Sequence, residues 1–261
     1  MYRQRFIICS FFALSTAFLL AGCSKPTRLP TIFGEVKNSE SFQTRFIGAS
    51  VENRPIEIIT LGRGEETTFI LATIHGDEPA GTKLVMELMQ YLQQKQELLA
   101  QRKVVLMPVT NPDGLVRNQR HNARGVDLNR NFSVANRLYN AVYGYSALSE
   151  PEARIIERVI REYKPARIVS IHQPFGCIDY DGPAKKLAEK MSQLTRLPMK
   201  KLGVMPGSLG SYAGLESGIP IVTLELLPDD HKLDAQTLWR RYGAGLIAAV
   251  VYPGIAAFPV K

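Results

Sequence analysis

Cysteine is scarce in this chain of 261 residues and occurs only at positions 9, 23 and 177. Cys9 lies in an N-terminal segment with the features of a cleaved signal, and Cys23 stands at the end of that segment. Only Cys177 then remains, so no intramolecular disulfide is available to the folded part. The stability of the fold must come from its hydrophobic core and from any bound metal ion.

Long hydrophobic runs are missing as well. The most apolar stretch, residues 6–20, carries no charge and follows two arginines. It is short for a membrane span, which needs about 20 apolar residues. This layout is typical of a secretory signal peptide. Leu20-Ala21-Gly22-Cys23 resembles the lipobox of bacterial lipoproteins, which implies cleavage before Cys23 and lipid on its thiol. The alternative is an ordinary cleaved signal followed by a chance cysteine.

These features divide the chain into a signal peptide at 1–22, a tether at 23–40 and one folded domain at 41–261. The tether contains Pro26 and Pro30 and shows no hydrophobic periodicity. Lipid on Cys23 would hold the domain on a membrane of the bacterial cell envelope, on the periplasmic side. We find no internal repeat and expect a monomer.

Acidic residues are in the minority, with 24 against 32 lysines and arginines, which gives a formal net charge of +8. A modest positive field suits anionic surfaces or acidic substrates. No basic run has aromatic residues interleaved with it, so we expect no nucleic-acid partner. The alternative, which suits most of these charges, is a solvated basic surface with no specific partner.

Strand-like and helix-like segments alternate along the folded domain. A hairpin is expected over residues 46–61. Buried strands are expected at Thr68–Ile74, Val104–Val109, Arg167–Ile171 and Pro220–Leu226. Helices are expected from Pro79, from a Ser149 cap to Tyr163, at Ala184–Thr195 and at Ala235–Val251. Asn111–Gly114 has the composition of a turn, and residues 115–148 that of a long functional loop. The alternation predicts an α/β fold: a mostly parallel mixed sheet sandwiched by helices.

Metal-binding residue types follow two of these strands. His75 and Glu78 come after one strand, and His172 comes after another. Sites gather at the carboxyl ends of parallel strands. Two histidines and one glutamate are a ligand set of catalytic zinc. A histidine at a strand end is more often structural, but the chain has only four. We therefore predict a zinc (Zn2+) site on these three side chains.

Two further features belong to the same edge of the predicted sheet. Glu225 lies within an apolar strand, where a charge is costly unless it is paired or functional. A carboxylate facing a metal-bound water is a suitable general base. The loop at 120–132 is rich in arginine and asparagine, and arginine grips carboxylates in a bidentate way. The alternatives are a glutamate paired with a buried arginine and a solvated basic loop.

Taken in order, these motifs resemble those of the zinc metallocarboxypeptidases of the carboxypeptidase A type. The resemblance spans about residues 45–250. Within that family it is strongest to the murein peptide amidase branch, which cuts the bond between γ-D-glutamate and meso-diaminopimelate. The motifs that carry it are His75-Gly76-Asp77-Glu78, Asn111-Pro112-Asp113-Gly114, Gly125–Phe132, His172-Gln173-Pro174, Pro206–Tyr212 and Glu225.

The resemblance implies a role for each matching residue. His75, Glu78 and His172 would bind zinc. Arg120 would polarise the scissile carbonyl, and Glu225 would activate the water and protonate the leaving amine. A fold of the carboxypeptidase or phosphorylase-like α/β/α type is implied with them.

The resemblance also implies how substrate is held. Asn129 and Arg130 would bind the carboxylate of the leaving residue, and Tyr212 is a candidate to cap the substrate. Asp179 or Asp181 would meet the distal ammonium of diaminopimelate, unless both are exposed loop acids. Murein (peptidoglycan) peptides are the expected partners. The alternatives are a general metallocarboxypeptidase or N-acyl amino acid deacylase and, more remotely, a non-catalytic lipoprotein that binds murein peptides.

Overall fold

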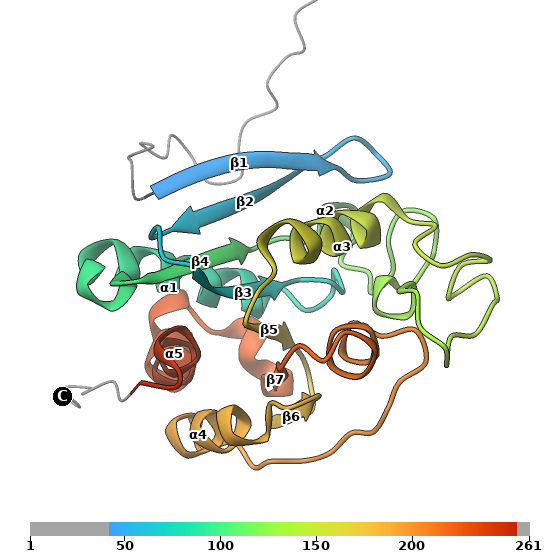
Figure 1. The fold of residues 1–261 in the computed structure, drawn as a ribbon. Helices are drawn as coiled ribbons and strands as arrows, with labels where there is room; N and C mark the ends of the chain where they lie inside the picture. Colours follow the sequence, from blue (N-terminus) through green and yellow to red (C-terminus); the bar gives the residue numbers. More distant parts are fainter. Residues whose placement is uncertain (1–41, 255–261) are drawn as a thin grey trace, which may run out of the picture.

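The computed structural model describes residues 42–254 and forms a seven-stranded mixed sheet in the order β1-β2-β4-β3-β5-β7-β6 (Figure 1). The inner strands β4, β3, β5 and β7 run parallel, whereas β2 and β6 run antiparallel to their inner neighbours. The strands are β1 (Phe42–Ala49), β2 (Pro55–Leu61), β3 (Glu66–Ala72), β4 (Arg102–Met107), β5 (Arg167–His172), β6 (Cys177–Asp181) and β7 (Ile221–Glu225). The predicted α/β fold with a mixed sheet is confirmed.

Helices cover both faces of the sheet (Figure 1). One face packs against α1 (Ala80–Gln94), α4 (Lys185–Thr195) and α5 (Ala235–Val251), and the other against α3 (Pro151–Tyr163) and the π-helix η3 (Ser211–Glu216). The remaining short elements are η1 (Gln96–Leu99), α2 (Pro112–Arg117), η2 (Leu128–Arg130) and η4 (Pro228–Lys232). Each face has its own hydrophobic cluster, so the sheet is buried between two layers.

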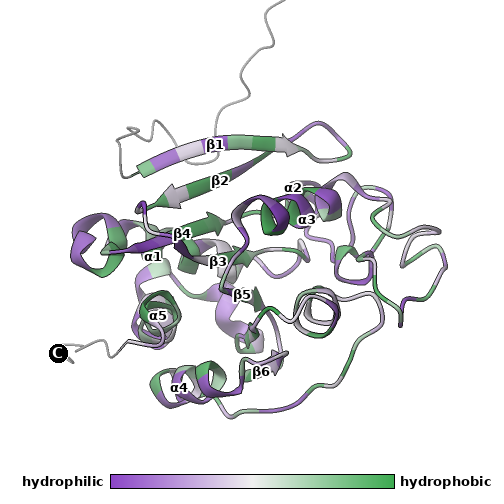
Figure 2. Ribbon diagram, viewed as in Figure 1, coloured by the Kyte–Doolittle hydropathy of each residue, from purple (hydrophilic) through white to green (hydrophobic). Residues whose placement is uncertain are grey.

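The hydrophobic pattern explains these layers. In α1 the apolar residues that recur three and four apart are all buried: Leu84, Val85, Leu88, Met89 and Leu92. The inner strands read as apolar runs because both their faces are covered. In Figure 2, α3 carries hydrophilic and hydrophobic residues side by side, whereas α5 is mostly hydrophobic. Accordingly α5 is buried along most of its length, including Leu238 and Leu246.

Two local predictions are wrong. The expected turn at Asn111–Gly114 is instead the start of α2. Asn111 Oδ1 accepts a hydrogen bond of 2.9 Å from Gly114 N, and Pro112 takes the first helical turn. Asparagine and proline favour turns and helix starts alike, so composition did not separate the two. Ser149 is not the cap of α3, because Glu150 holds that position and Ser149 Oγ bonds to its carboxylate.

Strand β6 was not predicted at all. It is five residues long and pairs only with β7 among the strands. Its alternating acids gave it the appearance of a loop. The interpretation of Asp179 and Asp181 as exposed loop acids is therefore wrong: both lie on β6, and Asp179 is buried.

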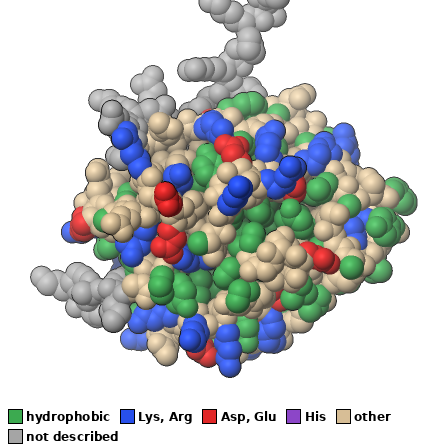
Figure 3. All heavy atoms as spheres, in the orientation of Figure 1, with side chains coloured by type: hydrophobic (Ala, Val, Ile, Leu, Met, Phe, Trp, Pro, Cys, Tyr) green, Lys and Arg blue, Asp and Glu red, His purple; other side chains and the backbone are tan. Residues whose placement is uncertain are grey.

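The predicted signal peptide, Cys23 and the tether lie outside the described residues. Within residues 42–254, none of the helices has both the length and the apolar character that a membrane span requires. Figure 3 shows lysine and arginine side chains spread over the visible face, with acidic and hydrophobic side chains between them.

Candidate metal centre and active site

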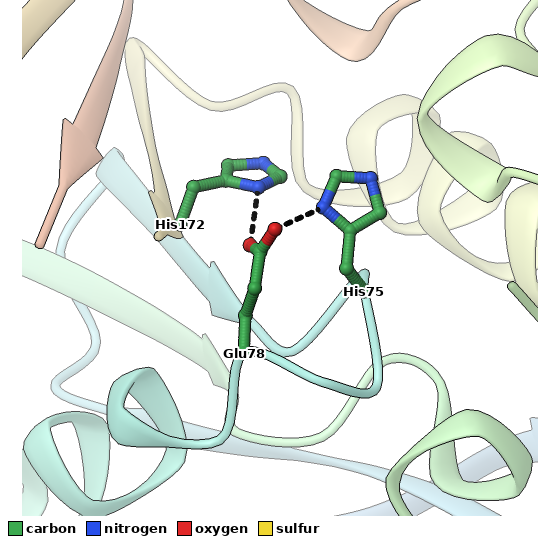
Figure 4. A group of neighbouring side chains, drawn as sticks. All are labelled: His75, Glu78 and His172. Carbon is green, nitrogen blue, oxygen red and sulfur yellow. Dashed lines mark hydrogen bonds and ion pairs between the residues drawn. The ribbon is translucent and has the colours of Figure 1, made fainter. Parts of the chain in front are cut away.

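Three buried side chains converge at the carboxyl ends of β3 and β5 (Figure 4). The Glu78 carboxylate lies between two imidazoles: Oε1 is 2.7 Å from His75 Nδ1, and Oε2 is 2.9 Å from His172 Nδ1. One donor atom from each residue lies within 4.8 Å of the others. β3 and β5 are parallel neighbours, so their ends bring together residues 94 positions apart in sequence. This donor set suits a catalytic zinc ion, which takes three protein ligands.

The turn that carries His75 and Glu78 depends on glycine. A Cβ atom on Gly76 would lie 2.0 Å from the carbonyl carbon of Gly114, closer than any side chain allows. Asn111 Nδ2 donates to the carbonyl of Ile74 at 3.3 Å, directly before this turn. The start of α2 therefore supports the backbone on which two of the three candidate ligands stand.

A charged pair behind His75 fixes the direction of its ring. Nε2 lies 3.2 Å from Asp127 Oδ1, and Asp127 Oδ2 accepts a 2.9 Å hydrogen bond from Arg120 Nε. Arg120 Nη1 also reaches Glu78 Oε1 at 3.4 Å. A carboxylate on the far nitrogen leaves Nδ1 of His75 free for a metal, as is usual for ligating histidines. Asp127 was not assigned a role from the sequence, although it stands inside the Gly125–Phe132 motif.

The charges of the centre support one another. Burial would raise the pKa of the Glu78 carboxyl, but the neighbouring rings of His172 and His75 outweigh it and lower that pKa. Burial would lower the pKa of His75, but the Glu78 and Asp127 carboxylates outweigh it and raise that pKa. Glu78 is thus held as the carboxylate that binds a divalent cation.

Glu225 reaches the centre from β7. Its Cα is the register partner of His172 on one side and of Cys177 on the other. Among residues 42–254, the one hydrogen bond to its carboxylate comes from the backbone N–H of Phe175, at 3.5 Å. Burial raises the pKa of Glu225 above its ordinary value, against the opposing pull of His172. A buried carboxylate with an elevated pKa beside a metal centre suits a group that accepts and returns a proton.

Asn129 and Arg130 lie on η2, two and three residues after Asp127. Asn129 Oδ1 accepts a 2.9 Å hydrogen bond from Leu209 N, which fixes its amide. The Arg130 guanidinium donates to the Asn129 carbonyl at 2.6 Å and lies 6.0 Å from the centre of the Tyr143 ring. Both side chains are partly exposed. Both therefore remain available to a ligand carboxylate.

Tyr212 has different neighbours. Its ring stacks on Phe132 with 5.6 Å between ring centres. Burial and the nearby Glu157 carboxylate on α3 raise the pKa of its hydroxyl. Among residues 42–254, the neighbours of Tyr212 are thus Phe132 and Glu157 of α3, on the side of the sheet that α3 covers.

Asn122 ties down the loop that carries the arginine–aspartate pair. Its Nδ2 donates to Glu150 Oε2 at 2.7 Å and to Glu152 Oε2 at 3.2 Å. Its Oδ1 accepts from the backbone N–H groups of Arg124 and Val126, at 3.0 and 3.1 Å. The side chain is buried. Its Nδ2 bonds connect the loop to the start of α3, and its Oδ1 bonds hold the loop backbone together. Asn122 therefore supports the loop on which Arg120 and Asp127 stand, a role that was not predicted from the sequence.

Asn122→Ala is expected to lower the free energy of unfolding by roughly 2 to 4 kcal/mol, because two buried carboxylates and two backbone donors each lose a hydrogen bond. Urea unfolding measures the change. Gln94→Ala, at an exposed position of α1, is the control and should stay within about 0.5 kcal/mol of the parent. Equal stability of the two variants would contradict the assignment.

The zinc carboxypeptidase family profile matches residues 35–192, more than half of the chain. The chain belongs to the zinc carboxypeptidase family. Murein peptide amidase A of Escherichia coli K12 is 34% identical over 181 residues, which cover 62% of this chain and 72% of that protein. Carboxypeptidase SOL1 of Arabidopsis thaliana is 31% identical over 157 residues, 58% of this chain and 30% of that one.

Solved structures of this family share the fold. Murein-tripeptide amidase MpaA from Escherichia coli O157 superposes with a TM-score of 0.66 and 24% identity, covering 82% of this chain and 93% of that one. Bovine thrombin-activatable fibrinolysis inhibitor gives a TM-score of 0.69 with 18% identity, covering 81% and 89%. The predicted membership of the family is confirmed. The protein is a hydrolase of the metallopeptidase type.

Proposed function

We propose that the protein is a zinc-dependent murein peptide amidase that hydrolyses the γ-D-glutamyl–meso-diaminopimelate bond. The observation that carries the proposal is the convergence of His75, Glu78 and His172 with Glu225 beside them at one sheet edge. The similarity to the murein peptide amidase of Escherichia coli supports the substrate. The positive net charge of the chain suits peptides that carry several carboxylates.

Each residue has a defined task in this proposal. Zinc held by the His–Glu–His group would supply a Lewis acid for the scissile carbonyl and the attacking water. Glu225 accepts the proton of the water and passes it to the leaving amine. Arg120 donates to the oxygen on which negative charge develops, and a single donor of this kind contributes on the order of 3 kcal/mol.

Asn129 and Arg130 set the position of the leaving residue. Their side chains bind its free carboxylate, and a bidentate arginine fixes orientation as well as affinity. Substrates whose terminal carboxylate is masked as an amide should therefore be poor. Because this binding requires a free terminal carboxylate, the enzyme is an exopeptidase.

The test incubates the zinc-loaded protein with L-Ala-γ-D-Glu-meso-diaminopimelate and, separately, with an ordinary L-peptide. Mass spectrometry identifies the products. Release of diaminopimelate supports the amidase. Cleavage of the ordinary peptide alone would move the activity to a general carboxypeptidase, and cleavage of N-acyl amino acids alone to a deacylase. Tight binding of the murein peptide without turnover of any substrate would indicate a binding protein.

We further propose that the protein is a periplasmic, membrane-anchored lipoprotein that acts as a monomer. Leu20-Ala21-Gly22-Cys23 after an uncharged apolar run supports the anchor. Cys23→Ser is expected to abolish incorporation of labelled fatty acid and to release the protein from the membrane fraction, because the thiol is the acylation site. Equal labelling of Cys23→Ser and the parent would rule out this anchor.

A further inference from the structure

The positive charge of the described chain is concentrated on one helix and the segment that follows it. Residues 42–254 contain 26 lysines and arginines and 22 aspartates and glutamates. Residues 185–201 include α4 and account for six of these cations and one of these acids: Lys185, Lys186, Lys190, Arg196, Lys200, Lys201 and Glu189. The rest of the described chain holds 20 cations and 21 acids, so it is close to neutral.

The six cations share one surface. All six are exposed, whereas the apolar residues of α4 pack inward against the core that contains α5. The segment after α4 returns along β6, where Lys200 N donates to Ile178 O at 3.0 Å. In Figure 3 a run of lysine and arginine side chains follows the lower edge of the molecule, where α4 lies in Figure 1. We call these six residues the α4 basic surface.

Most of the α4 basic surface has no counter-ion. Lys201 pairs with Asp181 Oδ1 at 3.1 Å, and Lys185 Nζ lies 4.0 Å from Glu189 Oε1. The other four cations form no ion pair within the part of the chain that the structure describes. An exposed cluster of like charges creates a positive potential that reaches about 10 Å into solution at 0.1 M salt.

The stability of α4 does not account for these charges. Lys185 and Lys186 stand in the first turn, where the helix dipole disfavours cations, and no acid accompanies them. Lys186 and Lys190 are four residues apart, and like charges at this spacing are unfavourable to a helix. The last turn, where the dipole would favour a cation, has none. Cations placed against the preferences of their own helix indicate a surface that binds an anionic partner.

The proposed lipid anchor brings such a partner within reach. Residues 23–41 would join the lipid to β1, and a chain of that length spans at most about 65 Å. β1 and β6 are the two edges of the sheet, and six strand spacings separate them by about 29 Å. The tether is therefore long enough for α4, which packs beside β6, to reach the same membrane. A weak second contact suffices there, because a tethered surface meets its partner at a high effective concentration.

We propose that the α4 basic surface docks the protein on anionic phospholipid headgroups. The inference rests on the lipid anchor of the proposed function for the nearness of the membrane. Headgroup phosphates supply the negative charge that the surface lacks, and each cation close to them strengthens the contact about fivefold. Lysine suits this task, because its flexible stem carries a hydrated point charge that needs no fixed geometry.

The experiment places the processed, lipidated protein in vesicles of phosphatidylcholine, with or without phosphatidylglycerol. Gln193→Cys on the exposed side of α4 carries a fluorophore, and a quencher is attached to the lipid headgroups. Cys177 is fully buried, so the label goes to position 193. Strong quenching is expected in the anionic vesicles only. Salt at 1 M should abolish it, because the Debye length then falls to about 3 Å.

Variants test the residues of the surface. One variant replaces three lysines that lack an ion pair among residues 42–254: Lys186→Gln, Lys190→Gln and Lys200→Gln. It should lower the ratio of docked to undocked protein about 100-fold, since three contributions of about fivefold are lost. Arginine at the same three positions should keep the docking. The matched control replaces three exposed lysines elsewhere and should keep it as well: Lys95→Gln, Lys164→Gln and Lys232→Gln.

Equal quenching in neutral and anionic vesicles, or docking of the glutamine variant as strong as that of the parent, would overturn the proposal. Binding to purified murein sacculi that the glutamine variant loses, with no effect of anionic lipid, would also overturn it and assign the surface to the polymer. None of these measurements depends on hydrolysis of a peptide, so failure of the amidase function is separate.

If the protein carries no lipid, the anchor fails and the surface is tested by co-sedimentation of the same proteins with the two kinds of vesicle. Binding to the phosphatidylglycerol vesicles that the glutamine variant loses and the control keeps would support the surface. No difference between the two kinds of vesicle would overturn it.

Discussion

Glu225→Gln is expected to reduce kcat by about 10²- to 10⁴-fold, the usual contribution of a positioned general base. The amide has nearly the same shape and can still accept from the Phe175 N–H, but it cannot take a proton from water. Zinc content and peptide affinity should stay close to those of the parent, because Glu225 does not belong to the His75, Glu78 and His172 donor group. Steady-state kinetics, metal analysis and calorimetry on one preparation measure all three.

Glu189→Gln on the exposed surface of α4 is the matched control, with the same chemical change away from the centre. It should leave kcat unchanged. If Glu225→Gln retained more than about a tenth of the parent kcat, the base would have to be another group. If it lost zinc, the loss of activity would say nothing about proton transfer.

Removal of zinc should lower the melting temperature markedly. An ion present at a thousand times its dissociation constant stabilises the folded state by about 4 kcal/mol. For a domain of this size, 1 kcal/mol corresponds to about 2 to 4 °C, so a chelator should lower the midpoint by roughly 8 to 16 °C. Calorimetric scans with zinc and with chelator measure the shift.

Glu78→Gln tests whether the shift belongs to this centre. The variant keeps hydrogen-bonding atoms between His75 and His172 but loses the anionic ligand. Its melting temperature should respond little to either zinc or chelator. A shift of full size in Glu78→Gln would place the stabilising ion elsewhere in the protein.

The sequence predicted the elements that are buried on both sides. The inner strands and the long helices carry strong hydrophobic patterns, and their positions were found within a few residues. β6 was not predicted, because a short edge strand with alternating acidic residues has no strong hydrophobic pattern. Asn111 and Ser149 were misread because the residues that favour turns also favour helix starts.

The site residues that could be predicted are likewise those next to segments with a strong hydrophobic pattern. His75, Glu78, His172 and Glu225 could be proposed because each stands at or near the end of an apolar strand, where a polar residue is conspicuous. Asp127 and Asn122 lie in an irregular loop, and their partners are set by tertiary contacts that composition does not encode. The burial of Asp179 could not be predicted from the sequence, because it depends on the pairing of β6 with β7.

The direction of β1 determines where a tether from the N-terminus would join the fold. β1 enters the sheet at Phe42, level with Leu61, Val104 and Arg167, and thus at the end of the sheet away from His172. Four strand spacings and five residues separate the two, about 19 Å across and 16 Å along the sheet. A tether from a lipid at Cys23 would therefore join the sheet at its corner farthest from the metal-binding edge. Attachment at this corner would leave the metal-binding edge uncovered and open to substrate.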